Sequence, residues 1–145
     1  MRMIKEVRFY EFGAVEDPLL KFAVILARAG GKWVFCKHRE RTTLEVPGGH
    51  REPGETVDET AARVLREETG AKEFTLRPIC VYSVVRDDAE ESFGGLYAAE
   101  IFAIEGINSE IEKILLMDQP PVDGWTYPDI QPKLLEEAGR RGAVT

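Results

Sequence analysis

The chain has 145 residues, of which 43% are hydrophobic and 31% charged, and this composition predicts a single globular domain spanning residues 1–145. Its formal net charge of −7 argues against binding a nucleic-acid polymer, which needs a basic surface, but it does not exclude a single nucleotide. No apolar run is long enough to span a membrane, and the N-terminal residues lack the apolar core of a signal peptide, so a cytoplasmic protein is expected.

The first part of the chain predicts β-strands. Residues 4–12 alternate in part between apolar and polar side chains, and residues 22–27 form a fully apolar run that is typical of a buried strand. The glycine pair at 30–31 predicts a tight turn into a further strand at 33–36. These segments are therefore expected to include a hairpin.

Two glycine turns follow. Residues 43–46 predict a short strand. The sequence Pro47-Gly48-Gly49 that follows it predicts a turn. Glycines here let the backbone approach a ligand closely, because no Cβ intervenes. A second turn, at 53–54, brings Glu55 to the start of the next element.

Residues 57–69 predict a helix. Thr56 and Glu59 have the spacing of a capping box, in which each side chain satisfies a free backbone N–H, and Gly70 is placed to end the helix. At about 100° per residue, Glu68 falls on the same side as the apolar side chains. A carboxylate there is costly to desolvate unless it is paired or bound to a metal.

The rest of the chain predicts further strands and a closing helix. The strands are expected at 74–85, 96–104 and 111–117, and the helix should end near Gly139 with Pro128 or Pro132 in its first turn. Residues 87–91, together with the glycine pair 94–95, are expected to form a mobile loop between two strands.

Three glutamates are expected to converge on the loop and helix: Glu55, Glu67 and Glu68. One interpretation is a solvated helix end in which Arg63 pairs with Glu67, one turn away. The combination with two glycine turns favours a metal site. Mg²⁺ prefers oxygen ligands, takes few of them from protein, and completes its shell with waters and substrate phosphates.

These residues resemble the Nudix box, G-x5-E-x7-R-E-U-x-E-E-x-G-U, in which U is a bulky aliphatic residue. The resemblance extends from Gly49 to Ala71, a small version of the last aliphatic position, and the matching residues are Gly49, Glu55, Arg63, Leu65, Glu67, Glu68 and Gly70. The preceding segment 45–49 is similar to the lead-in of the MutT-like branch. The resemblance implies an α/β fold, the Nudix-like α/β/α sandwich with a mixed sheet and a loop–helix catalytic motif.

The same resemblance implies a role for each matching side chain. Glu67 and Glu68 would take part in catalysis as ligands of Mg²⁺, or of Mn²⁺ in its place, and the Gly48 carbonyl could contribute another ligand. Glu55 would support the metal shell or its waters. Arg63 would orient the helix carboxylates by ion pairing and is expected to be structural, with no contact to phosphate.

Val64 departs from the pattern. The MutT-like branch has a glutamate at this place, which assists metal binding and activation of the attacking water, and a valine can do neither. The substitute base expected from the sequence is Glu100, a charged residue in the apolar strand 96–104. Related members carry an acidic residue in roughly this strand. The alternative is that Glu100 is an exposed strand residue, in which case Glu90 or Glu91 of the loop, or the metal alone, would activate the water.

Candidates for substrate binding lie on both sides of the box. Arg39 and Arg41 belong to a basic cluster that could contact phosphates through their guanidinium groups, or could simply be solvated. Trp125 and Tyr127 lie in a polar connection and are candidates for stacking on a base. Nothing in the sequence fixes which base.

The leading hypothesis is a Mg²⁺-dependent Nudix pyrophosphohydrolase that converts a nucleoside triphosphate into a nucleoside monophosphate and pyrophosphate. The MutT-like resemblance suggests an oxidised purine such as 8-oxo-dGTP. Two alternatives stay open. One is a hydrolase of a nucleoside diphosphate derivative, either a nucleotide sugar or ADP-ribose. The other is a Nudix-fold nucleotide-binding module with impaired turnover, which Val64 favours. The expected partner is a small-molecule nucleotide, and a monomer and a homodimer are equally compatible with the sequence.

Overall fold

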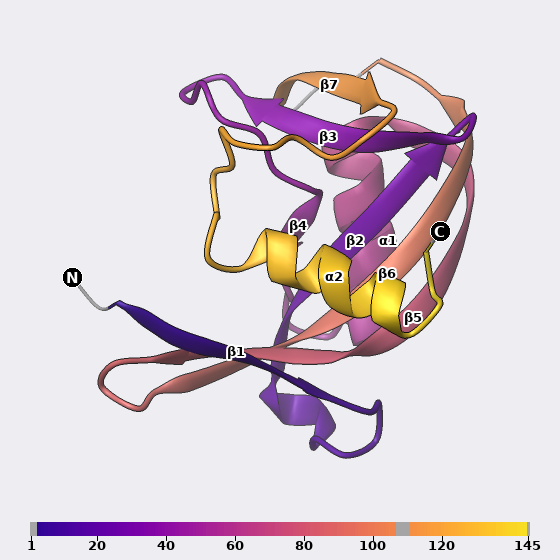
Figure 1. The fold of residues 1–145 in the computed structure, drawn as a ribbon. Coiled ribbons are helices and arrows are strands. Elements are labelled where there is room, and N and C mark those ends of the chain that lie inside the picture. The colour runs from indigo at the N-terminus through magenta and orange to yellow at the C-terminus, as the bar shows by residue number, and fades with distance from the viewer. Residues whose placement is uncertain (1–2, 107–110, 145) are drawn as a thin grey trace.

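The computed structural model describes residues 3–106 and 111–144, and in this part of the chain a seven-stranded sheet lies between two helices (Figure 1). The helices are α1 (Val57–Thr69) and α2 (Gln131–Arg140), with a short 3₁₀ helix, η1 (Asp17–Leu19). The strands are β1 (Ile4–Tyr10), β2 (Leu20–Ala29), β3 (Lys32–His38), β4 (Gly48–His50), β5 (Ala71–Arg86), β6 (Glu91–Ile104) and β7 (Ile111–Met117). No helix in the described ranges is long and apolar enough to cross a membrane. The predicted α/β/α sandwich is confirmed.

The sheet is mixed. Its strand order is β1-β5-β6-β2-β3-β7, and β4 pairs with β2 beside this path. The pairing of β2 with β6 is parallel, whereas the other pairings of named strands are antiparallel. One end of β2 pairs with β3 and the other end with β4. Strand β2 is therefore the central strand that positions β4.

Each face of the sheet has its own apolar core. Side chains alternate along a strand, so Ala23, Ile25 and Ala27 of β2 pack on the side of α1, while Val24 and Leu26 pack on the side of α2. In Figure 1, α1 lies behind the sheet and α2 in front of it. The sheet is buried on both faces, which explains the fully apolar run in β2.

The ends of α1 form as its sequence predicts. Thr56 accepts a hydrogen bond from the Glu59 N–H, and the Glu59 carboxylate accepts one from the Thr56 N–H, so both halves of the capping box are present. Gly70 ends the helix at φ 75°, and its N–H donates to the Arg66 carbonyl. In addition, the Tyr97 hydroxyl donates to Asp58, which joins the first turn of α1 to β6. The predicted helix 57–69 is confirmed at both ends.

The prediction for residues 43–49 is wrong in its strand and its turn. The segment 43–46 makes only isolated bridges, Leu44 to Trp125 and Glu45 to Cys36, and the regular strand is β4. Its glycines fit there because neighbouring atoms leave no room for side chains. A Cβ on Gly49 would lie 2.9 Å from a methyl group of Val64.

The predicted loop between two strands is confirmed at residues 87–90, but the prediction is wrong for Glu91 and the glycine pair. Strand β5 continues to Arg86 and β6 begins at Glu91, so a tight turn joins them. Gly94 and Gly95 lie inside β6, where a Cβ on Gly94 would meet the Tyr82 ring at 2.8 Å. A strand can contain glycine where another group approaches its backbone closely, and an aromatic ring does so here.

Gly70 and Gly54 offer a matched test of the end of α1. Both have positive φ, but a Cβ on Gly70 would overlap the Glu105 carbonyl, whereas nothing lies within 4 Å of a Cβ on Gly54. Gly54→Ala should cost about 1 kcal/mol of unfolding free energy from the left-handed backbone alone. Gly70→Ala should cost at least about 1 kcal/mol more, because overpacking adds to it. Urea denaturation measures both, and equal losses would contradict the packing described here.

Candidate active site

Strand β4 presents one edge to β2 and the other edge to α1. The Ile25 N–H donates to the Pro47 carbonyl at 2.9 Å, and the Arg51 N–H donates to the Lys21 carbonyl at 2.8 Å. Because successive residues of a strand point their backbone groups in opposite directions, Gly48 and His50 direct theirs away from β2. These groups face α1, where the candidate carboxylates lie.

Glu68 contacts this edge directly. The Gly48 N–H donates to Glu68 Oε1 at 3.1 Å, and the Glu68 side chain belongs to the buried polar residues, as its place on the apolar face predicts. The Cys36 thiol donates to the Glu68 backbone carbonyl at 3.6 Å. Burial raises the pKa of Cys36, and the negative charges of Glu68 and Glu45 raise it further. This corner of the molecule is therefore an anionic environment that suits a cation.

Arg63 connects the loop to the helix. Its guanidinium group donates to Glu55 at 2.6 and 3.1 Å, to Glu67 at 3.2 Å and to the His50 carbonyl at 2.8 Å. A planar fork of this kind can bind several oxygens in fixed directions, which a lysine cannot do. As the sequence predicts, the structure places Arg63 between carboxylates.

Glu55 is held as an anion at the centre of this network. The hydrogen bond from Arg63 lowers the pKa of Glu55 to about 2, with further contributions from the Glu52 N–H and the Thr60 hydroxyl. The side chain is 17% exposed. Its oxygens are thus occupied by four donor groups, which suits a carboxylate that supports the metal shell and does not itself bind the ion.

The remaining groups fit the Mg²⁺ that the Nudix box implies. Glu67 is 56% exposed beside Arg63, while Glu68 lies deeper. The N–H and C=O of one strand residue point to the same side, so the Gly48 carbonyl faces the side on which Glu68 lies. Across the described ranges, no three acidic, histidine or cysteine side chains are grouped closely enough to enclose an ion. Two carboxylates and a carbonyl still suffice for Mg²⁺, which keeps several waters.

Val64 fills the place of the missing glutamate with an apolar contact. It is 2% exposed, belongs to the core on the α1 face and lies directly beneath Gly49. A carboxylate at this place would have to displace that contact or extend past it. The departure from the Nudix box is therefore built into the packing of β4 on α1.

The structure does not bring Glu100 to this site. Its neighbours Ala99 and Ile101 belong to the core beneath α1, and side chains alternate along β6, so Glu100 faces the opposite side of the sheet. There it lines a hollow together with Arg28 and Arg77. The sheet separates Glu100 from Glu67 and Glu68.

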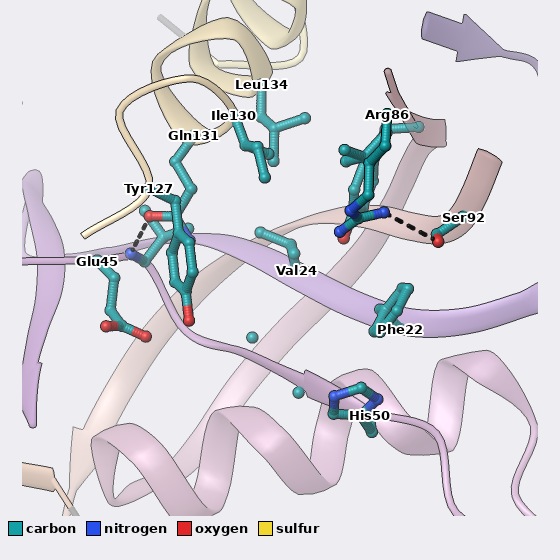
Figure 2. A pocket seen from close by; sticks show the side chains of 15 residues that line it. Phe22, Val24, Glu45, His50, Arg86, Ser92, Tyr127, Ile130, Gln131 and Leu134 are labelled. Atoms are coloured by element: carbon teal, nitrogen blue, oxygen red, sulfur yellow. Dashed lines mark hydrogen bonds between the residues drawn. The ribbon is translucent and has the colours of Figure 1, made fainter. Parts of the chain in front are cut away.

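A cavity of about 250 Å³ opens on the other side of β4 (Figure 2). Tyr127, Ile130, Gln131 and Leu134 lie on one side of it in Figure 2, and Phe22, Val24 and His50 lie on the other. The Phe22 and His50 rings pack edge to face at 4.8 Å. Glu45 lies toward one end, and Arg86, bonded to Ser92, lies at the other. The cavity is mainly apolar with a few polar groups, as ligand sites commonly are.

The predicted substrate residues lie in different places. Arg41 donates to the buried Glu45 at 2.9 Å, and its guanidinium group lies over the Tyr127 ring at 5.8 Å. Arg39 is exposed on the loop after β3. The indole N–H of Trp125 donates to the Pro121 carbonyl, and its ring packs on Phe35, so Trp125 lies outside the cavity that Tyr127 lines.

Two residues that line the cavity, Glu45 and Gln131, were not predicted from the sequence. Each carries a signal that could have been used. Glu45 is a charged residue between the apolar Leu44 and Val46, and its side chain is buried against His38 and Arg41. Gln131 shares the buried face of α2 with Leu134, one turn later.

Comparisons with known proteins agree with this geometry. The family model described as NUDIX domain matches residues 17–104, more than half of the chain, and the chain belongs to this family. The predicted Nudix membership is confirmed.

Three similar proteins illustrate the family. A crystal structure of the Bacillus subtilis pyrophosphohydrolase BsRppH has a TM-score of 0.79 and 26% identity, covering 96% of this chain and 93% of that one. The Bacillus subtilis (strain 168) protein named "Putative 8-oxo-dGTP diphosphatase YtkD" is 35% identical over 85 residues, 59% of this chain. The chain thus spans about half the length, 52%, of this curated relative. A C. elegans Ap4A hydrolase shares the fold alone, with a TM-score of 0.64 and 13% identity over 86% of this chain and 100% of its own.

Replacing Arg63 by lysine tests the network that it forms. Arg63→Lys keeps the charge but loses the fork, so the free energy of unfolding should fall by about 1–2 kcal/mol, the worth of one or two charge-assisted hydrogen bonds. The comparison variant is Arg66→Lys on the exposed side of α1, where the guanidinium group lies over the Phe74 ring at 5.1 Å and the loss should stay below about 1 kcal/mol, the worth of an exposed cation–π contact. Urea denaturation measures the free energy of unfolding of both variants. An Arg63→Lys variant as stable as the unmodified protein would contradict the role given to the Arg63 network.

Glu55 should make the free energy of unfolding depend on pH in the acidic range. Its pKa is about 2 in the folded chain and 4.5 ordinarily, so its stabilising contribution is fully present above about pH 4.5 and is lost as pH falls toward 2. The stability difference between the unmodified protein and Glu55→Gln should therefore be largest above pH 4.5 and shrink on acidification. Chemical denaturation at several pH values measures it. A difference that is constant across this range would contradict the assignment.

Proposed function

We propose that this chain is a Mg²⁺-dependent Nudix pyrophosphohydrolase that converts a nucleoside triphosphate into a nucleoside monophosphate and pyrophosphate. The observation that carries the proposal is the position of β4 between a base-sized cavity and the carboxylates of α1. Gly48 lines the cavity and also binds Glu68. A nucleotide whose base occupies the cavity would direct its phosphates across β4 toward Glu67 and Glu68.

Mg²⁺ bound there would neutralise charge on the phosphoryl oxygens and lower the pKa of a coordinated water. Glu68 and the Gly48 carbonyl would hold the ion from the buried side, and Glu67 from the solvent side. The network of Arg63 and Glu55 fixes the directions of these groups. Residues on this chain thus position the diphosphate, which is the main task of a catalyst of phosphoryl transfer.

The proton of the attacking water needs an acceptor, because Val64 cannot supply one. Glu67 is the more exposed of the two helix carboxylates and faces the solvent from which that water comes. We assign proton acceptance to a Glu67 carboxylate oxygen. A positioned base of this kind typically contributes about 10²–10⁴-fold.

The substrate we propose is an oxidised purine triphosphate, with 8-oxo-dGTP the first to test. The curated relative named for this activity supports the choice, as does a cavity with aromatic and aliphatic walls. A nucleotide-binding module with impaired turnover is a second candidate, favoured by the buried Val64.

Product analysis separates these functions. The chain is incubated with Mg²⁺ and a panel of nucleoside triphosphates, nucleotide sugars and ADP-ribose, and the products are identified by mass spectrometry. Equal yields of monophosphate and pyrophosphate from a triphosphate support the proposal. Turnover of the diphosphate derivatives alone would replace it with the other hydrolase, and binding without turnover would replace it with the module.

Glu68→Gln tests the metal-binding half of the site. The variant should keep its fold, because glutamine can still accept from the Gly48 N–H, but it should lose turnover at least about 100-fold. Losing a residue that merely supports a metal site already costs about 10–100-fold. Mg²⁺ affinity should fall as well. Glu73→Gln, at an exposed carboxylate on β5, is the control. Normal turnover and Mg²⁺ affinity in Glu68→Gln would rule out this assignment.

A further inference from the structure

Gln131 is a buried polar side chain at the cavity. It opens α2, is only 5% exposed and shares the buried face of that helix with Leu134. Its Oε1 accepts a hydrogen bond from the Val46 N–H at 2.9 Å, across 85 residues of sequence. Figure 2 shows this bond at the edge of the cavity.

That bond fixes which end of the amide faces the cavity. A backbone N–H can only donate, so it must meet the carbonyl oxygen of the side chain, and the NH₂ group points the other way. Within residues 3–106 and 111–144, Gln131 Nε2 donates no hydrogen bond. In the same ranges no fully enclosed side-chain nitrogen or oxygen lacks a partner, so this NH₂ group is not sealed inside the protein, and the cavity that Gln131 lines is the space beside it.

The surroundings of this NH₂ group are mostly apolar. Val24, Ile130 and Leu134 supply aliphatic walls, and Tyr82 and Tyr127 supply aromatic ones. A hydrogen bond made in mostly apolar surroundings is stronger than one made in bulk water, and a donor left without a partner is costly. The occupant that satisfies the site is therefore a planar ring with an acceptor on its edge.

On this basis we propose that Gln131 is a specificity-determining residue that selects purine nucleotides with a carbonyl oxygen at C6 over those with an amino group there. The inference rests on the proposed function and adds to it the chemical group of the substrate that Gln131 recognises, the substituent at C6. Glutamine recognises adenine by using its oxygen and its nitrogen together. Here the oxygen is turned toward the Val46 N–H, so the NH₂ group is the end turned toward the cavity, and it matches the C6 oxygen of guanine or hypoxanthine.

Substrate analogues test this on the unmodified protein. GTP and ITP carry the C6 oxygen, ATP carries an amino group, and purine riboside triphosphate carries hydrogen at C6. We expect kcat/KM for GTP and ITP to exceed that for the other two by about tenfold, the effect of one hydrogen bond in a dry site. Equal values for ITP and purine riboside triphosphate would overturn the inference.

Gln131→Glu tests the residue itself. The carboxylate can still accept from Val46 but offers the cavity an acceptor in place of the donor, so the ratio of kcat/KM for ITP and ATP should fall at least about tenfold. Gln119→Glu, the same change at an exposed glutamine, should leave the ratio unchanged. An unchanged ratio in a folded Gln131→Glu variant would overturn the inference. If that variant does not fold, the comparison of substrate analogues on the unmodified protein tests the inference.

Binding separates failure of this inference from failure of the proposed function. If no triphosphate is turned over, the proposed function fails, and calorimetry with IMP and purine riboside monophosphate still tests the residue. IMP should bind about tenfold more tightly to the unmodified protein, and Gln131→Glu should abolish the difference. Equal affinities for the unmodified protein would overturn the assignment of Gln131.

Discussion

The candidate active site depends on the hydrogen bonds that the Arg63 guanidinium group donates. It binds Glu55 from the loop, Glu67 from its own helix and the His50 carbonyl from β4. The guanidinium group therefore ties three segments together in one arrangement. An exposed ion pair contributes little to stability, but a partly buried fork with several oxygens fixes directions, and positioning is what phosphoryl transfer requires.

Glycine at positions 48 and 49 is the second constraint, because it allows β4 to lie between β2 and α1. The Gly49 backbone rests on Val64, and Gly48 binds the Glu68 carboxylate. One short strand thereby separates an apolar cavity from an anionic corner. A nucleotide has an apolar base and a charged phosphate chain, and under the proposed function each part would meet a matching surface on one side of β4.

The sequence predicts α1 well because its signals are local. Thr56 caps the helix and Gly70 ends it through hydrogen bonds to residues within one turn of themselves. Strand β4 was not predictable in this way, since glycines favour turns and the pairing depends on β2. The position of Glu100 was also not predictable, because the alternation of side chains along a strand does not show which face of the sheet lies toward the site. The role of Gln131 depends on Val46, which lies 85 residues away, and no local pattern encodes that contact.

Paramagnetic broadening by Mn²⁺ tests the central claim most directly, because it reports which backbone amides lie near the bound ion. Substoichiometric Mn²⁺ would be added to isotopically labelled protein with a nucleoside monophosphate present, and amide signals followed by NMR. The account predicts that the signals of Gly48, Glu67 and Glu68 broaden first, while that of Glu100, across the sheet, persists. Broadening centred on Glu100, or spread evenly over the acidic surface, would contradict it.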